Sequence, residues 1–104
     1  MISLKNMSLD TTITIVDNDK RLKAGQLRYM IKGSEAEIFD TYVFPEYRRQ
    51  RLMSNLLKRV TSELKISGVS KMRLKYFDEG ARIAWEKMGF KEIGKNGHME
   101  LDIR

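Results

Sequence analysis

The chain has 104 residues, of which 41% are hydrophobic and 33% charged, with no cysteine, one histidine and a formal net charge of +6. This composition predicts one folded domain over residues 1–104, and it argues against disulfides, thiolate or histidine-rich metal centres and a cysteine nucleophile. Because no apolar run approaches the roughly 20 residues of a membrane span and the first residues lack an apolar signal segment, we expect a cytoplasmic protein that binds neither metal nor membrane.

Two strands joined by a turn are predicted in the first third of the chain. Residues 11–16 alternate, with Ile13 and Ile15 on one face, and the Asp-Asn-Asp-Lys that follows is rich in turn formers. Residues 22–32 also alternate polar with apolar side chains and end at Gly33. The pattern predicts an antiparallel hairpin that is buried on one face.

The next segment, residues 36–44, is apolar on both faces, as is typical of an interior strand. The apolar residues of this segment do not stay on one face, since Ile38 is even-numbered while Phe39 and Val43 are odd-numbered. A β-bulge would explain this change of face. Pro45 ends the strand because proline cannot donate a ladder hydrogen bond.

A long amphipathic helix is predicted over residues 46–67, where apolar residues recur at helical spacing from Leu52 to Leu64. Residues 71–76 then alternate strictly as a strand. The order strand, helix, strand predicts a right-handed crossover that joins two parallel strands, 36–44 and 71–76.

A short helix and a hairpin are predicted in the last third. Apolar residues lie at i, i+3, i+4 and i+7 from Ala81 to Met88, and Gly89 follows where a left-handed residue commonly ends a helix. The Asn-Gly pair at 96–97 predicts a tight turn between the two final strands.

The stretch PEYRRQRLMSNLLKRV holds an uneven share of the positive charge. Residues 46–67 contain six Lys or Arg against two Asp or Glu, whereas residues 1–44 contain six of each. A helix N-terminus offers unpaired N–H groups and a positive dipole end to a phosphate, and Arg48, Arg49 and Arg51 would add bidentate donors. Charge and position alone support an anion site and an ordinary solvated helix face about equally.

Two segments in this order, PEYRRQRLMSNLLKRV and ARIAWEKMGFKEI, resemble signature regions of the GNAT superfamily of acyl-CoA-dependent N-acyltransferases. The resemblance covers residues 35–103 and implies a GNAT-like α/β (α+β) fold with a mixed, mostly antiparallel sheet in the order β-β-β-α-β-α-β-β. It also implies that the family's usual N-terminal strand and helix pair are lacking. The acceptor side would then be open, shallow or completed by another subunit, as in a homodimer.

The resemblance implies acetyl-CoA as the acyl donor. Backbone amides of the turn that opens the long helix would bind its pyrophosphate, and the end of the preceding strand would pair with its pantetheine arm. The implied cofactor-binding residues are Val43, Phe44, Arg48, Arg49, Gln50, Arg51, Leu52, Met53 and Ser54. Arg51 and Met53 depart from the family pattern, which has small residues there that let the backbone approach a phosphate closely.

The catalytic groups also depart from the pattern. The tyrosine that often serves this family as general acid aligns with Trp85, whose indole N–H has no useful pKa for proton transfer. The nearest acid or base candidates by topology are Glu37, Asp40, Tyr76 and Glu79. The resemblance thus implies a minimal N-acetyltransferase that moves acetyl directly to an amine of a small molecule or protein.

Two alternatives remain open. The side chains at 51, 53 and 85 are also compatible with a catalytically inactive GNAT-fold protein that serves as a binding or regulatory module. A basic nucleic-acid-binding module would use the cationic face at 48–59, but the chain lacks the interleaved exposed aromatic residues that favour single-strand binding.

Overall fold

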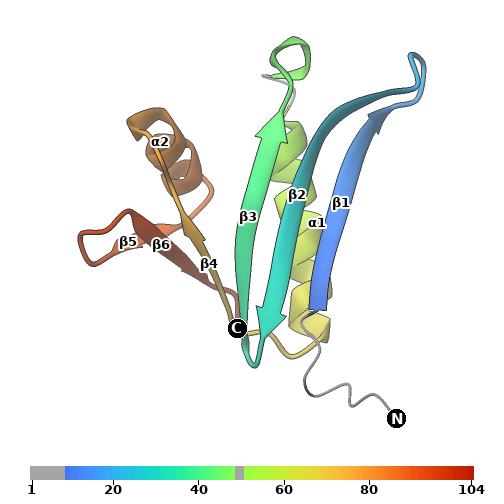
Figure 1. Ribbon diagram of the computed structural model, residues 1–104. Coiled ribbons are helices and arrows are strands. Elements are labelled where there is room, and N and C mark those ends of the chain that lie inside the picture. Colours follow the sequence, from blue (N-terminus) through green and yellow to red (C-terminus); the bar gives the residue numbers. More distant parts are fainter. Residues whose placement is uncertain (1–8, 49–50) are drawn as a thin grey trace.

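The computed structural model describes residues 9–48 and 51–104. One six-stranded sheet has the order β1-β2-β3-β4-β6-β5 (Figure 1). The strands are β1 Leu9–Asp17, β2 Leu22–Lys32, β3 Glu35–Val43, β4 Lys71–Lys75, β5 Lys91–Ile93 and β6 His98–Asp102. The helical segments are η2 Pro45–Tyr47, a 3-10 turn, and the α-helices α1 Leu52–Ile66 and α2 Glu79–Lys87. The predicted fold class and order of elements are confirmed.

The strand pairing follows the alternation in the sequence. β1, β2 and β3 form an antiparallel ladder, and β3 lies inside the sheet as predicted. β3 and β4 are parallel, but they pair only at residues 35–37 and 71–73. Beyond these residues the two strands diverge toward their carboxyl ends (Figure 1). The predicted parallel pair is confirmed, and its divergence leaves the later part of β3 without a neighbouring strand on that side among the described residues.

The predicted bulge in β3 is also confirmed. The register between β2 and β3 shifts between Gln26 and Arg28, so two β3 residues stand opposite one β2 residue. Asp40, one of those two, has a φ of 50°, in the left-handed region. Because side chains alternate along a strand, the extra residue reverses which of the following side chains face the core.

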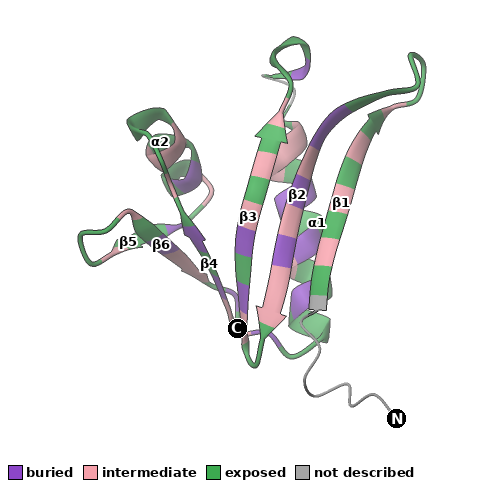
Figure 2. Cartoon of the chain, in the orientation of Figure 1, coloured by how far each residue is buried: buried purple, intermediate pink, exposed green. Residues whose placement is uncertain are grey.

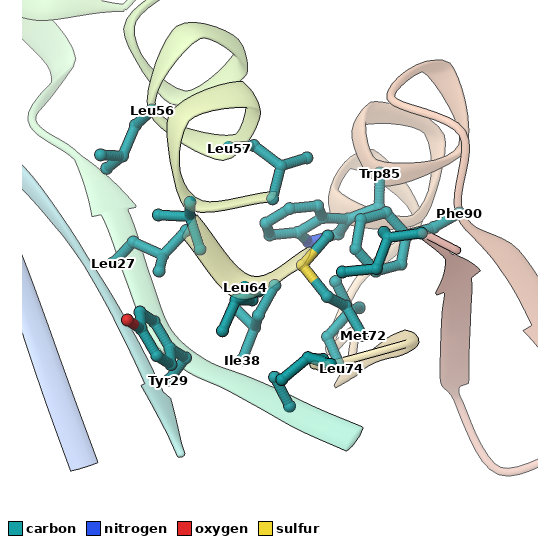
Figure 3. Close-up of a cluster of buried hydrophobic side chains, with 14 of the residues drawn as sticks. Leu27, Tyr29, Ile38, Leu56, Leu57, Leu64, Met72, Leu74, Trp85 and Phe90 are labelled. Atoms are coloured by element: carbon teal, nitrogen blue, oxygen red, sulfur yellow. The ribbon is translucent and has the colours of Figure 1, made fainter. Parts of the chain in front are cut away.

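Both helices pack on one face of the sheet. α1 lies behind the long strands in Figure 1 and supplies an apolar stripe to the core, while α2 supplies Trp85 (Figures 2 and 3). The largest fully buried side chains are Leu27, Val60, Leu64, Met72, Phe90 and Met99. Each buried side chain of this size contributes about 1.5–3 kcal/mol of transfer free energy, so this face holds the domain together.

The opposite face of the sheet carries charged side chains. Arg28 is 2.6 Å from Asp10 and 3.2 Å from Asp40, and Arg73 lies between Glu35 and Glu100 at 3.7 and 3.6 Å. These groups are substantially exposed, so each pair adds little to stability. They give the face a polar surface that suits contact with water or with a polar ligand.

The predicted start of the long helix is wrong. α1 begins at Leu52 and not at residue 46, because Arg51 has a φ of 56°, a left-handed conformation that an α-helix cannot contain. The preceding η2 turn is fixed by tertiary contact, since buried Tyr47 donates a 2.8 Å hydrogen bond to Asp17. Long-range packing therefore decides the conformation of a segment whose local pattern favoured a helix.

The predicted turn glycines at 89 and 97 are confirmed, and the structure adds a helix cap that was not predicted. Asp78 accepts a 2.7 Å hydrogen bond from the Ala81 N–H and caps α2, and Gly89 follows the helix with a φ of 103°. Gly97 has a φ of 80° in the turn that joins β5 and β6 as an antiparallel hairpin. Over residues 9–48 and 51–104, no helix is long and apolar enough to cross a membrane.

Candidate functional site

A cavity of about 670 Å³ lies where β3 and β4 diverge. It is lined by residues 37–42, residues 74–78, Gln26 of β2, and Ala81 and Trp85 of α2. Before the bulge at Asp40, side chains alternate along the β3 wall, so buried Ile38 faces the helices while exposed Glu37 faces the charged side. The cavity therefore connects the helix side of the sheet with its charged face.

The N-terminus of α1 presents backbone N–H groups. The first N–H groups of a helix have no intrahelical carbonyl to bind, and the first such bond here runs from the Asn55 N–H to the Arg51 carbonyl, at 3.0 Å. Among the described residues no side chain caps this end, and the first turn contains no acidic residue. The amides of residues 52–54 are therefore suited to bind an anion.

The loop between β3 and α1 is tied back to the end of β3. Arg48 Nε donates a 3.0 Å hydrogen bond to the Val43 carbonyl. The Phe44 N–H donates to the Ala24 carbonyl at 2.8 Å, so this group belongs to the sheet. The Val43 carbonyl and the Phe44 N–H, which were expected to pair with a pantetheine arm, therefore already have partners in the protein. The edge of β3 beyond Glu37 is left unpaired toward β4.

The two departures from the family pattern point in different directions. Met53 is partly buried and packs against the core. Arg51 is exposed, and its backbone has the left-handed conformation that a glycine adopts without strain. Leu52 and Ser54 are half-buried in the first turn. The predicted residues Arg49 and Gln50 lie outside the described residues.

Two of the four predicted acid or base candidates are carboxylates that line the cavity from β3. Glu37 lies 3.6 Å from Lys32, and Asp40, at the bulge, lies 3.2 Å from Arg28. Both carboxylates are exposed on the charged face. They can attract a protonated amine, but each already has a cationic partner.

Tyr76 also lines the cavity, and its environment differs from that of the carboxylates. Its hydroxyl donates a 3.1 Å hydrogen bond to Glu92 Oε1. Burial, followed by this hydrogen bond, raises the pKa of Tyr76 above its usual value of 10.0. The phenol therefore stays protonated at neutral pH and can pass a proton only if it gains one in exchange.

Glu79 does not line the cavity. It is bound to Arg82, with Oε2 accepting from Nε at 2.9 Å, and this hydrogen bond lowers the pKa of Glu79. The Arg82 guanidinium also forms an ion pair with Glu86, with a nitrogen–oxygen distance of 2.6 Å. Glu79 therefore serves as an ionised partner of Arg82 in the first turn of α2.

Trp85 packs as a core residue that also reaches the cavity. Its ring meets Phe90 edge to face, with centroids 5.3 Å apart, and points from α2 toward α1 (Figure 3). The indole offers no titratable proton at this wall. The position aligned with the family's acidic tyrosine thus contributes packing and apolar surface.

Several lining residues were not predicted. Phe39, Tyr42 and Phe77 add aromatic surface, and Phe77 is 86% exposed. Asp78 could have been found, because an aspartate three residues before an apolar helical position is a common N-cap signal. No pattern in the sequence marks Glu92, because only the folding of the β5–β6 hairpin brings this residue to Tyr76.

In the part of the chain that the structure describes, no three His, Asp or Glu side chains group closely enough for a metal ion.

Comparison with known proteins agrees with this geometry. Residues 7–90 match the family model described as "Acetyltransferase (GNAT) family". No curated protein matches the chain significantly in sequence. The fold is similar to a GNAT-family acetyltransferase from Staphylococcus aureus Mu50, with a TM-score of 0.84 and 16% identity over 93% of this chain and 70% of that one.

Two further solved structures show the same fold. PaiA N-acetyltransferase from Thermoplasma acidophilum, in complex with coenzyme A, has a TM-score of 0.80 and 21% identity over 89% of this chain and 60% of that one. The ribosomal-protein-S18-alanine N-acetyltransferase from Escherichia coli has a TM-score of 0.76 and 24% identity over 95% and 72%. Because the family model matches most of the chain, this protein belongs to the GNAT acetyltransferase family.

Proposed function

We propose that this protein is an N-acetyltransferase that moves acetyl directly from acetyl-CoA to an amine. The observation that carries the proposal is the cavity between the diverging ends of β3 and β4, which opens beside an unpaired strand edge. Its volume of about 670 Å³ falls within the range of small-molecule sites. Family membership and the coenzyme A complex of a protein with the same fold support an acyl-CoA as one ligand.

The residues present fit an acyl-CoA. Amides 52–54 at the start of α1 suit its pyrophosphate, and Arg48 and Arg51 add positive charge to the same turn. Met53 packs toward the core and leaves the amides accessible. The unpaired edge of β3 can bind the amide groups of a pantetheine arm as an added strand would.

The acceptor amine would enter from the charged face of the sheet. Glu37 and Asp40 lie at that end of the cavity and favour a cationic ligand, while Ile38, Leu74 and Trp85 form the apolar helix side. In direct transfer the amine nitrogen attacks the thioester carbonyl and the thiolate leaves. Holding both reactants in one cavity supplies much of the rate enhancement, so few catalytic side chains are needed.

A specific observation favours a second candidate, an inactive GNAT-fold binding protein. Trp85 offers no proton at the wall where the family often has an acid, and Glu37 and Asp40 are each paired with a cation. Such a protein would bind an acyl-CoA and retain it without turnover. The two candidates agree on ligand binding and differ on chemistry.

Calorimetry with acetyl-CoA tests the step that both candidates share. We expect measurable heat and a rise in the unfolding temperature, because a ligand at a hundred times its Kd stabilises the folded state by about 2.7 kcal/mol. Acetyl-pantetheine, which lacks the pyrophosphate, should bind more weakly. No heat and no thermal shift with millimolar acetyl-CoA would exclude both candidates.

A further inference from the structure

Tyr76 joins the cavity to a carboxylate outside it. The residue follows β4 and lines the cavity, and its hydroxyl donates to Glu92 Oε1 at 3.1 Å. Glu92 lies on β5, is exposed and pairs across the hairpin with Met99. Because the phenol uses its proton to bind Glu92, its oxygen lone pairs are directed elsewhere and can accept a proton from another group.

Arg82 of α2 anchors this carboxylate. Its Nε lies 3.7 Å from Glu92 Oε1, and the same guanidinium pairs with Glu79 and Glu86 of its own helix. Three carboxylates thus surround one cation, and the cluster keeps a net negative charge. The charged groups that act on Tyr76 are Glu92 from β5 and Arg82 and Glu79 from α2, while β6 places only Met99 opposite Glu92.

We propose that Tyr76 and Glu92 form a proton relay that deprotonates the acceptor amine, an inference that rests on the proposed acetyl transfer. An N–H bond of the ammonium breaks and its proton passes to Tyr76 Oη, while the original hydroxyl proton passes to Glu92 Oε1. The products are a neutral amine, a neutral phenol and a protonated Glu92. The exposed carboxylic acid then loses its proton to water, which restores the starting state.

The other polar groups of the cavity are less suited to this task. Glu37 and Asp40 are paired with Lys32 and Arg28, as Glu92 is with Arg82, but among the described residues neither is hydrogen-bonded to a hydroxyl that lines the cavity. Trp85 has no lone pair that accepts a proton. The Tyr76–Glu92 pair instead links the wall of the cavity to an exposed carboxylate through a hydrogen bond already formed.

The test compares Glu92→Gln with Glu86→Gln in steady-state acetyl transfer. Both changes remove one carboxylate that pairs with Arg82, but only Glu92 touches Tyr76. We expect Glu92→Gln to lower kcat at neutral pH by about 10²-fold, as is usual when a general base is lost, with KM for acetyl-CoA nearly unchanged. Activity should recover as rising pH deprotonates the amine in solution. Glu86→Gln should behave like the unmodified protein.

Non-additivity tests whether the two residues act as one unit. Tyr76→Phe, which removes a single oxygen, should lower kcat about as much as Glu92→Gln, and the double variant should fall no further. A Glu92→Gln variant as active as Glu86→Gln, or a double variant whose loss is the product of the single losses, would overturn the relay alone. No turnover by the unmodified protein with any amine would overturn the relay together with the proposed transferase activity.

Discussion

The Arg48 guanidinium donates a hydrogen bond of 3.0 Å from Nε to the carbonyl oxygen of Val43. This contact folds the loop back on the end of β3 and holds a positive charge beside the strand edge that faces the cavity. In the proposed complex this charge would act on the phosphates of the acyl-CoA donor.

Arg48→Ala should weaken acetyl-CoA binding about tenfold, which corresponds to the loss of about 1.4 kcal/mol from one charge-assisted contact. Lys58→Ala is the matched control, because it removes the same charge from an exposed position further along α1. Titration calorimetry measures both dissociation constants. Equal weakening by the two variants would show that only the net charge of the protein matters.

Arg51→Gly should stabilise the fold by about 1 kcal/mol, since a left-handed conformation costs a residue with a side chain roughly that much more than glycine. Arg51→Ala removes the same guanidinium but keeps a Cβ, so it should give no such gain. Urea unfolding measures both free energies. A gain in Arg51→Ala as large as that in Arg51→Gly would mean that charge, and not backbone strain, sets the stability here.

The Tyr47–Asp17 hydrogen bond should make the free energy of unfolding depend on pH in the acid range. Tyr47 is the main cause that lowers the pKa of Asp17 below 3.8 in the folded protein. A lowered carboxyl pKa contributes stability that is present above 3.8 and is lost as the pH falls through the folded value. Tyr47→Phe should therefore unfold at lower urea than the unmodified protein at neutral pH, and the difference should shrink below pH 3.8. A difference that persists unchanged in acid would contradict this assignment.

Trp85 should matter more for stability than for chemistry. Trp85→Ala should cost about 3–5 kcal/mol, because it leaves a hole beside Phe90 in the core. Trp85→Phe keeps most of the packing and should lose less stability while leaving kcat nearly unchanged. Thermal unfolding and turnover, measured on the same preparation, separate the two effects. A large fall in kcat for Trp85→Phe would give the indole a direct part in the reaction.

Strong local periodicity made most of the fold predictable. The alternating strands, the apolar stripe of α1 and the Asn-Gly hairpin each follow from side-chain spacing that packing reinforces. The start of α1 could not be predicted in this way. It depends on a contact between Tyr47 and Asp17, 30 residues apart, which opposes the local helical pattern.

The candidate site was predicted in part because topology alone brings some residues together. The parallel pairing of β3 and β4 predicts that three candidates, Glu37, Asp40 and Tyr76, lie near one another. The later parts of the two strands form walls of the cavity. Glu79 was expected there too, but capping by Asp78 starts α2 so that Glu79 binds Arg82 outside the cavity. Glu92 could not be inferred, since no pattern shows which strand of a hairpin will reach Tyr76.

The most direct test of the proposed transfer is the release of coenzyme A thiol from acetyl-CoA in the presence of a panel of primary amines. The chain contains no cysteine, so a thiol-reactive chromogen reports only the product. We predict thiol release that requires both acetyl-CoA and an amine and that rises with protein concentration. Binding of acetyl-CoA without thiol release for any amine would contradict the transferase and leave the inactive binding protein as the function of this fold.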